Sequence, residues 1–281
     1  MIKALRAVNK KKKIILFSPK GYIGGFIKEK LQEENDVMLY GITRNSDLEQ
    51  YQGNYDIMIY SAAITSTRNE TIDKYIQDNV VTAVSMIHFC EKHHIKRIIY
   101  LSSDEIYGEL NTEVVTEETA MLNPNLYATT KYLAEKIIMN SGIPYYILRM
   151  PGVVGRVWGE TFVYRLMDRI KRNEQIELYN LDRNFNNLLD IDDLTQFIAK
   201  LCNERSNKEN HIFLLGNMEK LKLEEIVSYI KALYHSVSVI KNRDTNNKRY
   251  FTLDVTNAVK HGYSSKSIIA IIDELYHLRE G

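Results

Sequence analysis

Short apolar runs alternate with segments of helical periodicity over the first half of the chain. The apolar runs have the length of buried strands, and the segments between them repeat apolar positions every three to four residues. The predicted strands are Ile14–Phe17, Val37–Gly41, Ile57–Ser61, Ile98–Leu101 and Tyr145–Arg149. The predicted helices are Ile23–Glu33, Lys74–His93 and Leu126–Ser141. This alternation predicts an α/β fold with a doubly wound parallel sheet.

The pattern changes after Pro151. The predicted helices of this second part are Thr161–Asn173, Asp192–Asn203, Leu223–Tyr234 and Ser264–Leu278. The predicted strands are Gln175–Tyr179 and His211–Leu215. We therefore expect residues 1–150 to form the sheet domain and residues 151–281 to form a smaller lobe that is interwoven with it.

Composition narrows the class of protein. The 281 residues carry 37 basic and 36 acidic side chains, a net charge of +1, which provides no general field for nucleic acid or an anionic membrane. No apolar run has transmembrane length, and we expect no secretory signal. Cys90 and Cys202 are far apart, which favours reduced thiols and the cytoplasm. The seven His residues are scattered without a ligand pattern, so we expect no metal site.

A Tyr and a Lys four residues apart are the first candidate for chemistry. Tyr127 and Lys131 share one face of the predicted helix, where the ammonium can lower the pKa of the phenol. Such a phenol can exchange a proton with a hydroxyl group. The spacing also occurs by chance in a chain with 19 Tyr, in which case the pair is a solvated helix surface.

The segment upstream supports the first interpretation. Ser102, Ser103, Asp104 and Glu105 follow a predicted strand, and ligands of open α/β sheets bind at the carboxyl ends of strands. On their own these residues would be interpreted as a polar turn. Together with the Tyr–Lys helix they predict an active site.

A glycine-containing turn follows the first predicted strand. Gly21 and Gly24 stand between this strand and a helix, so the backbone can approach a phosphate at the positive end of the helix. The unit indicates a dinucleotide-binding domain of the Rossmann type in residues 1–150.

These motifs together resemble the extended short-chain dehydrogenase/reductase superfamily, in its nucleotide-sugar epimerase/dehydratase branch. The resemblance runs along nearly the whole chain. The matching segments are Ile14–Gly24, Asp56–Ala63, Asn79–Val80, Ser102–Gly108, Tyr127 with Lys131, Arg149–Gly155, Asp190–Asp193 and Leu253–Tyr263.

The resemblance implies an enzyme that uses NAD or NADP on a nucleotide sugar, in surface-polysaccharide sugar synthesis, as a homodimer. The implied catalytic residues are Ser103, Tyr127 and Lys131, with Asp104 and Glu105. The implied cofactor-binding residues are Ser18, Gly21, Tyr22, Ile23, Gly24, Arg44, Ala62, Ala63, Asn79 and Lys131. The implied substrate-binding residues, in the lobe of residues 151–281 and just before it, are Arg149, Gly152, Arg183 and Asn186.

Three positions depart from the family pattern. Ser18 stands where the first glycine of the cofactor turn is expected. Gly152 replaces the Asn of the segment after Arg149, and Asn186 replaces an Arg that binds the diphosphate. Arg183, three residues earlier, is the nearest cation that could take its place.

The sequence leaves several activities open. Ser103-Asp104-Glu105 matches the triplet of nucleotide-sugar 4,6-dehydratases, whereas the short second half favours 4-keto reduction or epimerisation. No acid ends the second strand, and Arg44 follows it, which favours NADP over NAD. The three departures also allow a non-catalytic NAD(P)-binding protein.

Overall fold

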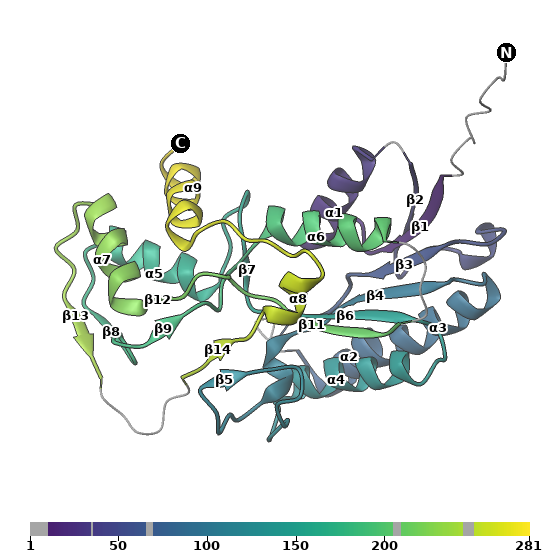
Figure 1. The fold of residues 1–281 in the computed structure, drawn as a ribbon, viewed down its shortest axis with the longest axis horizontal. Coiled ribbons are helices and arrows are strands. Elements are labelled where there is room, and N and C mark those ends of the chain that lie inside the picture. Colours follow the sequence, from purple (N-terminus) through teal and green to yellow (C-terminus); the bar gives the residue numbers. More distant parts are fainter. Residues whose placement is uncertain (1–10, 35, 66–69, 205–208, 244–249) are drawn as a thin grey trace, which may run out of the picture.

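The computed structural model describes residues 11–34, 36–65, 70–204, 209–243 and 250–281. Its centre is a six-stranded parallel sheet in the order β11-β6-β4-β3-β1-β2 (Figure 1). These strands are β1 (Lys12–Phe17), β2 (Val37–Ile42), β3 (Ile57–Tyr60), β4 (Arg97–Leu101), β6 (Tyr145–Arg149) and β11 (His211–Leu214). The predicted doubly wound parallel sheet is confirmed.

Helices cover both faces of this sheet (Figure 1). One face carries α1 (Tyr22–Gln32) and α6 (Ile191–Asn203), and the other carries α3 (Thr82–Lys92) and α4 (Leu126–Met139). The side chains of β1 alternate accordingly. Ile14 and Leu16 enter the core under α1 and α6, whereas Ile15 and Phe17 enter the core under α3 and α4.

The predicted helix Lys74–His93 is interrupted. It is observed as α2 (Ile72–Tyr75), a π-helical stretch over Ile76–Val81, and α3. π-helical stretches are frequent at functional sites, because they change the direction of a side chain within a helix. Here the stretch includes Asn79, whose buried side chain reaches the loop after β3.

The second half of the chain builds a separate core to the left of the sheet in Figure 1. This core is formed by α5 (Phe162–Lys171), α7 (Leu223–Leu233) and α9 (Ile268–Glu280). Short strand pairs complete it: β7 (Val153–Val154) with β10 (Leu189–Asp190), β8 (Ile176–Leu178) with β13 (Ile240–Asn242), and β9 (Asn184–Phe185) with β12 (Leu221–Lys222). A further pair, β5 (Val114–Val115) with β14 (Thr252–Leu253), and α8 (Thr256–Lys260) link the two halves.

The chain crosses between the two halves more than once. β11 and α6 follow residue 150, yet β11 pairs with β6 in the large sheet and α6 packs against α1. A division of the chain at residue 150 stays a prediction.

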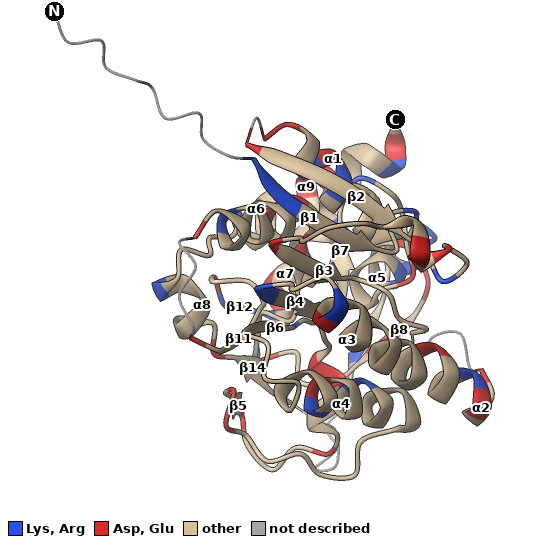
Figure 2. Cartoon of the chain, turned by 90° about the vertical axis from the view of Figure 1, so that its right-hand side faces the viewer, with Lys and Arg blue, Asp and Glu red and all other residues tan. Residues whose placement is uncertain are grey.

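Figure 2 views the side of the molecule farthest from the second core. Basic and acidic residues are interspersed along the backbone on this side rather than gathered by sign. No helix in the described part of the chain is long and apolar enough to cross a membrane. The same described residues contain no group of three or more His, Cys, Asp or Glu that could hold a metal ion.

Candidate active site

The order of the strands reverses beside β1. The chain runs from β1 to β2 on one side of β1 and then to β3 on the other side. In doubly wound sheets the crevice outside the carboxyl ends of the strands at this point binds the ligand. The loops after β1 and β3 border that crevice here.

The loop after β1 leaves room for a phosphate at the start of α1. Gly21 precedes α1, and no side chain in the described residues caps this helix or adds an acid to its first turn. Its first amides are therefore free to bind an anion. A Cβ on Gly24 would lie 2.0 Å from the Ser18 carbonyl oxygen and 3.0 Å from Ser61 Oγ, so only glycine allows α1 to approach β1 this closely.

Ser18 takes over the backbone conformation of the missing glycine. Its φ is 71°, in the left-handed region, and its amide donates to the Ile42 carbonyl at 2.7 Å. Left-handed backbone costs a residue with a Cβ about 1–2 kcal/mol. Ser18 therefore holds a backbone conformation that favours glycine.

The neighbouring residues contribute backbone rather than side chains to this turn. Ile23 packs against the core, and the Tyr22 hydroxyl donates to the Gly155 carbonyl at 3.2 Å. After β3, Ala63 packs with Ile64, Tyr75 and Tyr127. The loop of Ala62 and Ala63 thus connects the turn to the predicted catalytic helix.

Asn79 was predicted to bind the cofactor, but its side chain is bonded within the protein. Its Oδ1 accepts from the Ile64 amide at 2.9 Å, and its Nδ2 lies 3.3 Å from the Ile64 carbonyl and 3.1 Å from Thr130 Oγ1. These bonds occupy the amide, so Asn79 fixes the loop after β3 to α4 instead of contacting a ligand directly.

Arg44 lies just beyond the end of β2. Its guanidinium is 2.9 Å from Asp78 Oδ2, and Lys74 Nζ is 2.7 Å from the same oxygen. The Arg44 side chain is 37% exposed, whereas that of Asp78 is 6% exposed. If Arg44 turns to another anion, Asp78 therefore keeps Lys74 as its partner.

Ser103 and Tyr127 meet at the carboxyl end of β4. α4 begins at Leu126 after Asn125, whose side chain accepts from the Ala128 amide at 2.8 Å. This cap places Tyr127 in the first turn of α4, where its phenol is close enough to the Ser103 hydroxyl for Ser103 to lower its pKa against the opposing effect of burial. Both side chains are at least nine-tenths buried.

Lys131 points away from Tyr127, and the expected lowering of the Tyr127 pKa is wrong. Lys131 Nζ donates to the Leu101 carbonyl at 2.5 Å and lies 4.1 Å from the centre of the Tyr100 ring. Burial raises the pKa of Tyr127, and the charge of Glu105 raises it further. Burial also lowers the pKa of Lys131 to about 7, because its ammonium is removed from water.

Asp104 and Glu105 separate in a 3₁₀ turn over Asp104–Tyr107. Asp104 lines a cavity, and burial raises its pKa to about 7, with a further contribution from the charge of Glu105. Glu105 is exposed and accepts from Asn125 Nδ2 at 3.0 Å. The two carboxylates therefore have different surroundings.

The cavity beside Asp104 has a volume of about 300 Å³. Of the predicted substrate-binding residues, Gly152 and Arg183 line it. Sequence reasoning missed most of its other walls, which are aromatic or amide side chains. The aromatic ones are Phe162, Tyr179, Phe185, Tyr250 and Phe251, and the amides are Asn180, Asn184 and Asn187. The asparagine-rich run between Asn180 and Asn187 was the one signal in the sequence that could have indicated this wall.

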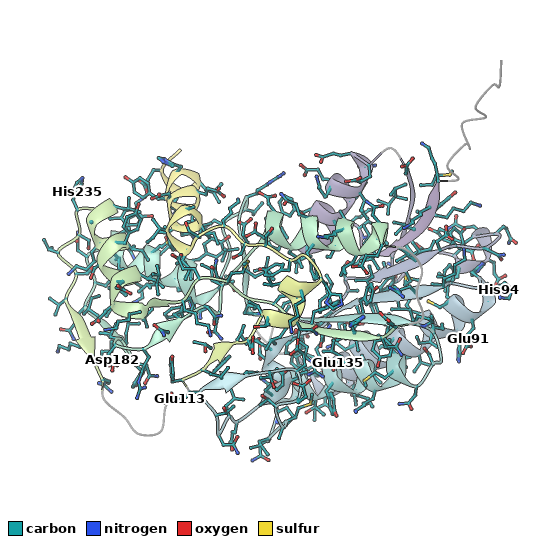
Figure 3. The ribbon with its side chains drawn as sticks, in the orientation of Figure 1. Glu91, His94, Glu113, Glu135, Asp182 and His235 are labelled. Carbon is teal, nitrogen blue, oxygen red and sulfur yellow. The ribbon has the colours of Figure 1, made fainter. Side chains whose placement is uncertain are left out.

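Arg149 is not at the cavity, which corrects the prediction that it binds substrate. It is 3% exposed, and its guanidinium donates to Glu135 at 3.2 and 2.9 Å. It also donates to the Tyr107 hydroxyl and the Glu117 carbonyl, each at 2.9 Å. Glu135 is a fully buried residue of α4 (Figure 3). The guanidinium therefore makes its hydrogen bonds within the core.

Asn186 is also in the core rather than at the cavity. It is fully buried, and its Nδ2 donates to the carbonyls of Asn217 at 3.0 Å and Leu253 at 2.9 Å. Its Oδ1 accepts from the Leu253 amide at 2.9 Å. The prediction that Asn186 binds substrate is therefore wrong, because backbone groups satisfy the whole side chain.

Residues 19–216 match the model of the NAD dependent epimerase/dehydratase family. The chain belongs to this family. A relative in this comparison is the trifunctional UDP-glucose 4,6-dehydratase/UDP-4-keto-6-deoxy-D-glucose 3,5-epimerase/UDP-4-keto-L-rhamnose-reductase of Arabidopsis thaliana. It is 22% identical over 228 residues, which cover 75% of this chain and 34% of that protein. The chain thus spans about a third of that relative's length.

Other relatives match over most of their length. An uncharacterized UDP-glucose epimerase of Bacillus subtilis is 23% identical over 277 residues, covering 89% of this chain and 84% of that protein. The UDP-glucuronic acid 4-epimerase of Bacillus cereus, solved with NAD, aligns with a TM-score of 0.80 at 17% identity, over 95% of this chain and 99% of that one. RMD of Pseudomonas aeruginosa, solved with NADPH, aligns with a TM-score of 0.77 at 15% identity, over 96% and 99% of the two chains. These structures show the same fold.

The conformation of Ser18 generates a test of the cofactor turn. Ser18→Gly removes the Cβ from a left-handed residue and should raise the free energy of unfolding by about 1 kcal/mol. Ser85→Gly is the matched control, because Ser85 is an exposed residue within α3 and should lose about 0.5 kcal/mol. Urea denaturation measures both variants. Destabilisation of both would contradict the strained turn.

Proposed function

We propose that this chain is an NAD(P)-dependent enzyme that epimerises a nucleotide sugar or reduces its 4-keto form. The carrying observation is the position of Tyr127. Its phenol is close to Ser103 and Asp104, and its ring packs against Ile64 of the loop after β3; Asp104 in turn lines the cavity. A proton-transferring group thus stands between the dinucleotide crevice and a site for a second ligand.

The residues of the crevice fit a dinucleotide. The uncapped start of α1 supplies amides for the pyrophosphate, and Gly24 permits the close packing of α1 on β1. The nicotinamide of a bound cofactor would supply the hydride acceptor or donor for a sugar carbon. Both NAD and NADPH occur in the aligned structures named above.

We propose NADP as the preferred form. Arg44 is the cation after β2, and it can exchange the carboxylate of Asp78 for a 2′-phosphate. Lys74 would remain on Asp78 after this exchange, so the buried carboxylate keeps a partner.

The cavity fits a nucleotide sugar in shape and chemistry. A second cavity of about 370 Å³ shares Phe162, Tyr179, Asn180 and Leu223 with the first, so the two form one elongated site. We place the sugar beside Asp104 and Tyr127, and the nucleotide toward the second cavity. Amide side chains suit sugar hydroxyls, and aromatic rings suit a base.

Arg183 is the proposed contact of the diphosphate. It is the only cationic side chain among the described residues of the first cavity, and its guanidinium lies 5.4 Å from the Tyr250 ring centre. Its carboxylate neighbours are Glu113 at 3.5 Å and Asp182 at 3.9 Å, both exposed (Figure 3). Exposed pairs of this kind are weak, so a diphosphate can displace them.

The protein's own part in the reaction is proton transfer and orientation. Tyr127 would give its proton to the oxygen of a keto sugar, or accept one from a sugar hydroxyl. Because its pKa is raised in the protein alone, the phenol is protonated and ready to donate. Ser103 would hydrogen-bond the same sugar oxygen and orient it.

A dehydratase is the second candidate, because Asp104 lines the cavity and its pKa is raised to about 7. A carboxyl group of that pKa can protonate a leaving hydroxyl near neutral pH. Glu105 weakens this candidate, because its carboxylate is exposed and bonded to Asn125 instead of lining the cavity.

We also propose a cytoplasmic homodimer. Exposed apolar side chains follow neighbouring helices on one face of the sheet domain: Leu126 and Leu133 on α4, and Ile76 and Val84 beside it. A second copy can cover these residues about a twofold axis, because each copy then presents the same apolar surface to the other.

The function is tested by turnover of nucleotide sugars with NADH and NADPH. Tyr127→Phe should slow turnover by about 10²- to 10⁴-fold, because the transferable proton is lost. The stability and the affinity for ligands should stay close to those of the wild type. Tyr132→Phe on the same helix is the matched control and should be near normal. Wild-type turnover in Tyr127→Phe would refute the assignment.

Turnover in deuterated water separates the two candidates. We expect no deuterium at C5 or C6 of the sugar and no loss of water, because Glu105 does not line the cavity. Asp104→Asn should then slow turnover only modestly, by much less than the 10²- to 10⁴-fold that the loss of a catalytic acid or base causes. Deuterium at both carbons, with water lost, would instead establish the dehydratase.

The dimer is tested by sedimentation velocity. Leu133→Asp should convert the dimer to a monomer, because it buries a carboxylate in the apolar interface. Leu278→Asp, at an exposed position on α9, should leave the dimer intact. A monomeric wild-type protein would overturn the proposal.

A further inference from the structure

One tyrosine of the cofactor turn reaches across to the second half of the chain. Tyr22 is the first residue of α1, and its ring is 40% exposed. Its hydroxyl donates to the Gly155 carbonyl oxygen at 3.2 Å, and the same glycine is bonded to the hydroxyl of Tyr164 on α5. The helix that begins at the pyrophosphate turn is therefore joined to the segment after β7.

Tyr22 and Tyr164 hold the same glycine from two sides. A hydroxyl has one hydrogen to donate and two lone pairs to accept. The Tyr22 hydroxyl donates its hydrogen to the Gly155 carbonyl. The Tyr164 hydroxyl accepts from the Gly155 amide at 2.7 Å and donates to the carbonyl of Gly155 at 3.0 Å or that of Val157 at 3.1 Å. Removing the Tyr22 hydroxyl therefore takes away the hydrogen bond that joins α1 to Gly155.

The Gly155 segment is held on every side. The φ of Gly155 is +130°, and a Cβ there would lie 2.6 Å from Ile191 Cγ2. The next residue, Arg156, pairs with Glu29 of α1 at 2.6 Å and with Asp192 of α6 at 2.9 Å. A shift of Tyr22 is therefore passed on to Gly155, because Gly155 is closely packed and cannot absorb it.

The chain on either side of the Gly155 segment forms walls of the substrate cavity. β7 is preceded by Gly152, and the first turn of α5 includes Phe162 as well as Tyr164. Gly152 and Phe162 both line the cavity. The junction thus connects the amides that would bind the pyrophosphate to two walls of the sugar site.

We propose that Tyr22 is a positioning residue whose hydroxyl couples dinucleotide binding at α1 to the shape of the nucleotide-sugar cavity. A dinucleotide fixes the first turn of α1, and the Tyr22–Tyr164–Gly155 junction then fixes Gly152 and Phe162. The second ligand binds a cavity that is already ordered, so its affinity rises. The coupling is reciprocal, as thermodynamic linkage requires. This inference rests on the proposed function.

The test measures binding of each ligand alone and in the presence of the other. The probes are UDP, GDP and dTDP, with NADH and NADPH, by calorimetry on the full chain. In the wild type, the dinucleotide should tighten nucleotide binding. Tyr22→Phe should reduce this coupling about fivefold, the effect of one net hydrogen bond, with each single affinity within about twofold of the wild type.

Two further variants show whether the junction acts as a unit. Tyr164→Phe should lose the same coupling, and the double variant should lose no more, because both changes break one network. Tyr229→Phe is the matched control, since its hydroxyl also donates a hydrogen bond, to Asp273 at 2.6 Å, but far from α1. Wild-type coupling in Tyr22→Phe, or no coupling in the wild type, would overturn the inference.

A ligand-free measurement separates this inference from the proposed function. Tyr22→Phe should increase amide hydrogen exchange at Gly155 and Val157, because the loss of the bond to the Gly155 carbonyl loosens the segment in which these amides bond Tyr164 and Gly155, and it should leave α3 unchanged. Unchanged exchange at these two amides refutes the junction itself. Wild-type protein that binds no dinucleotide and no nucleotide refutes the proposed function, whatever the exchange shows.

Discussion

The buried ion pair of Arg149 and Glu135 joins the elements that carry the candidate catalytic side chains. Arg149 is the last residue of β6, and Glu135 lies one turn after Lys131 on α4. Arg149 also bonds the hydroxyl of Tyr107, which is the last residue of the 3₁₀ turn that begins at Asp104. Leaving either charge without its partner in the core costs about 3–5 kcal/mol. Ser103, Tyr127 and Lys131 therefore keep their relative positions because the core beneath them cannot shift independently.

Burial also sets the protonation of the site. It lowers the pKa of Lys131 to about 7 and raises that of Asp104 to about 7, so both groups change charge near neutral pH. Burial also raises the pKa of Tyr127, and the nearby carboxylates of Glu105 and Asp104 raise it further. Without ligands the site therefore holds a protonated phenol. A positively charged nicotinamide would change this balance in favour of the phenolate.

The second half of the chain gives the site its shape. Asn186 joins the backbone of Asn217 to that of Leu253 in the core, and the pairing of β14 with β5 ties Leu253 to Val115. The Gly155 segment links the cavity wall to α1 through Tyr22 and Arg156. The cofactor crevice and the cavity are thus parts of one packed unit, although their residues come from distant parts of the sequence.

The sequence by itself determined the parallel sheet, most of the helices that cover it and the glycine turn, because these depend on local periodicity and on glycines between a strand and a helix. It also named Ser103, Tyr127 and Lys131 as catalytic candidates from motifs of fixed spacing. It could not determine which partners the ends of long polar side chains contact. Arg149 and Asn186 looked available to a substrate, and Lys131 looked able to contact Tyr127, yet each is bound within the core. The cavity walls at Phe162, Tyr179 and Tyr250 likewise come together only when α5, β8 and β14 pack. Only the tertiary structure decided these positions, because the partner of a buried polar group is set by packing between segments far apart in the chain.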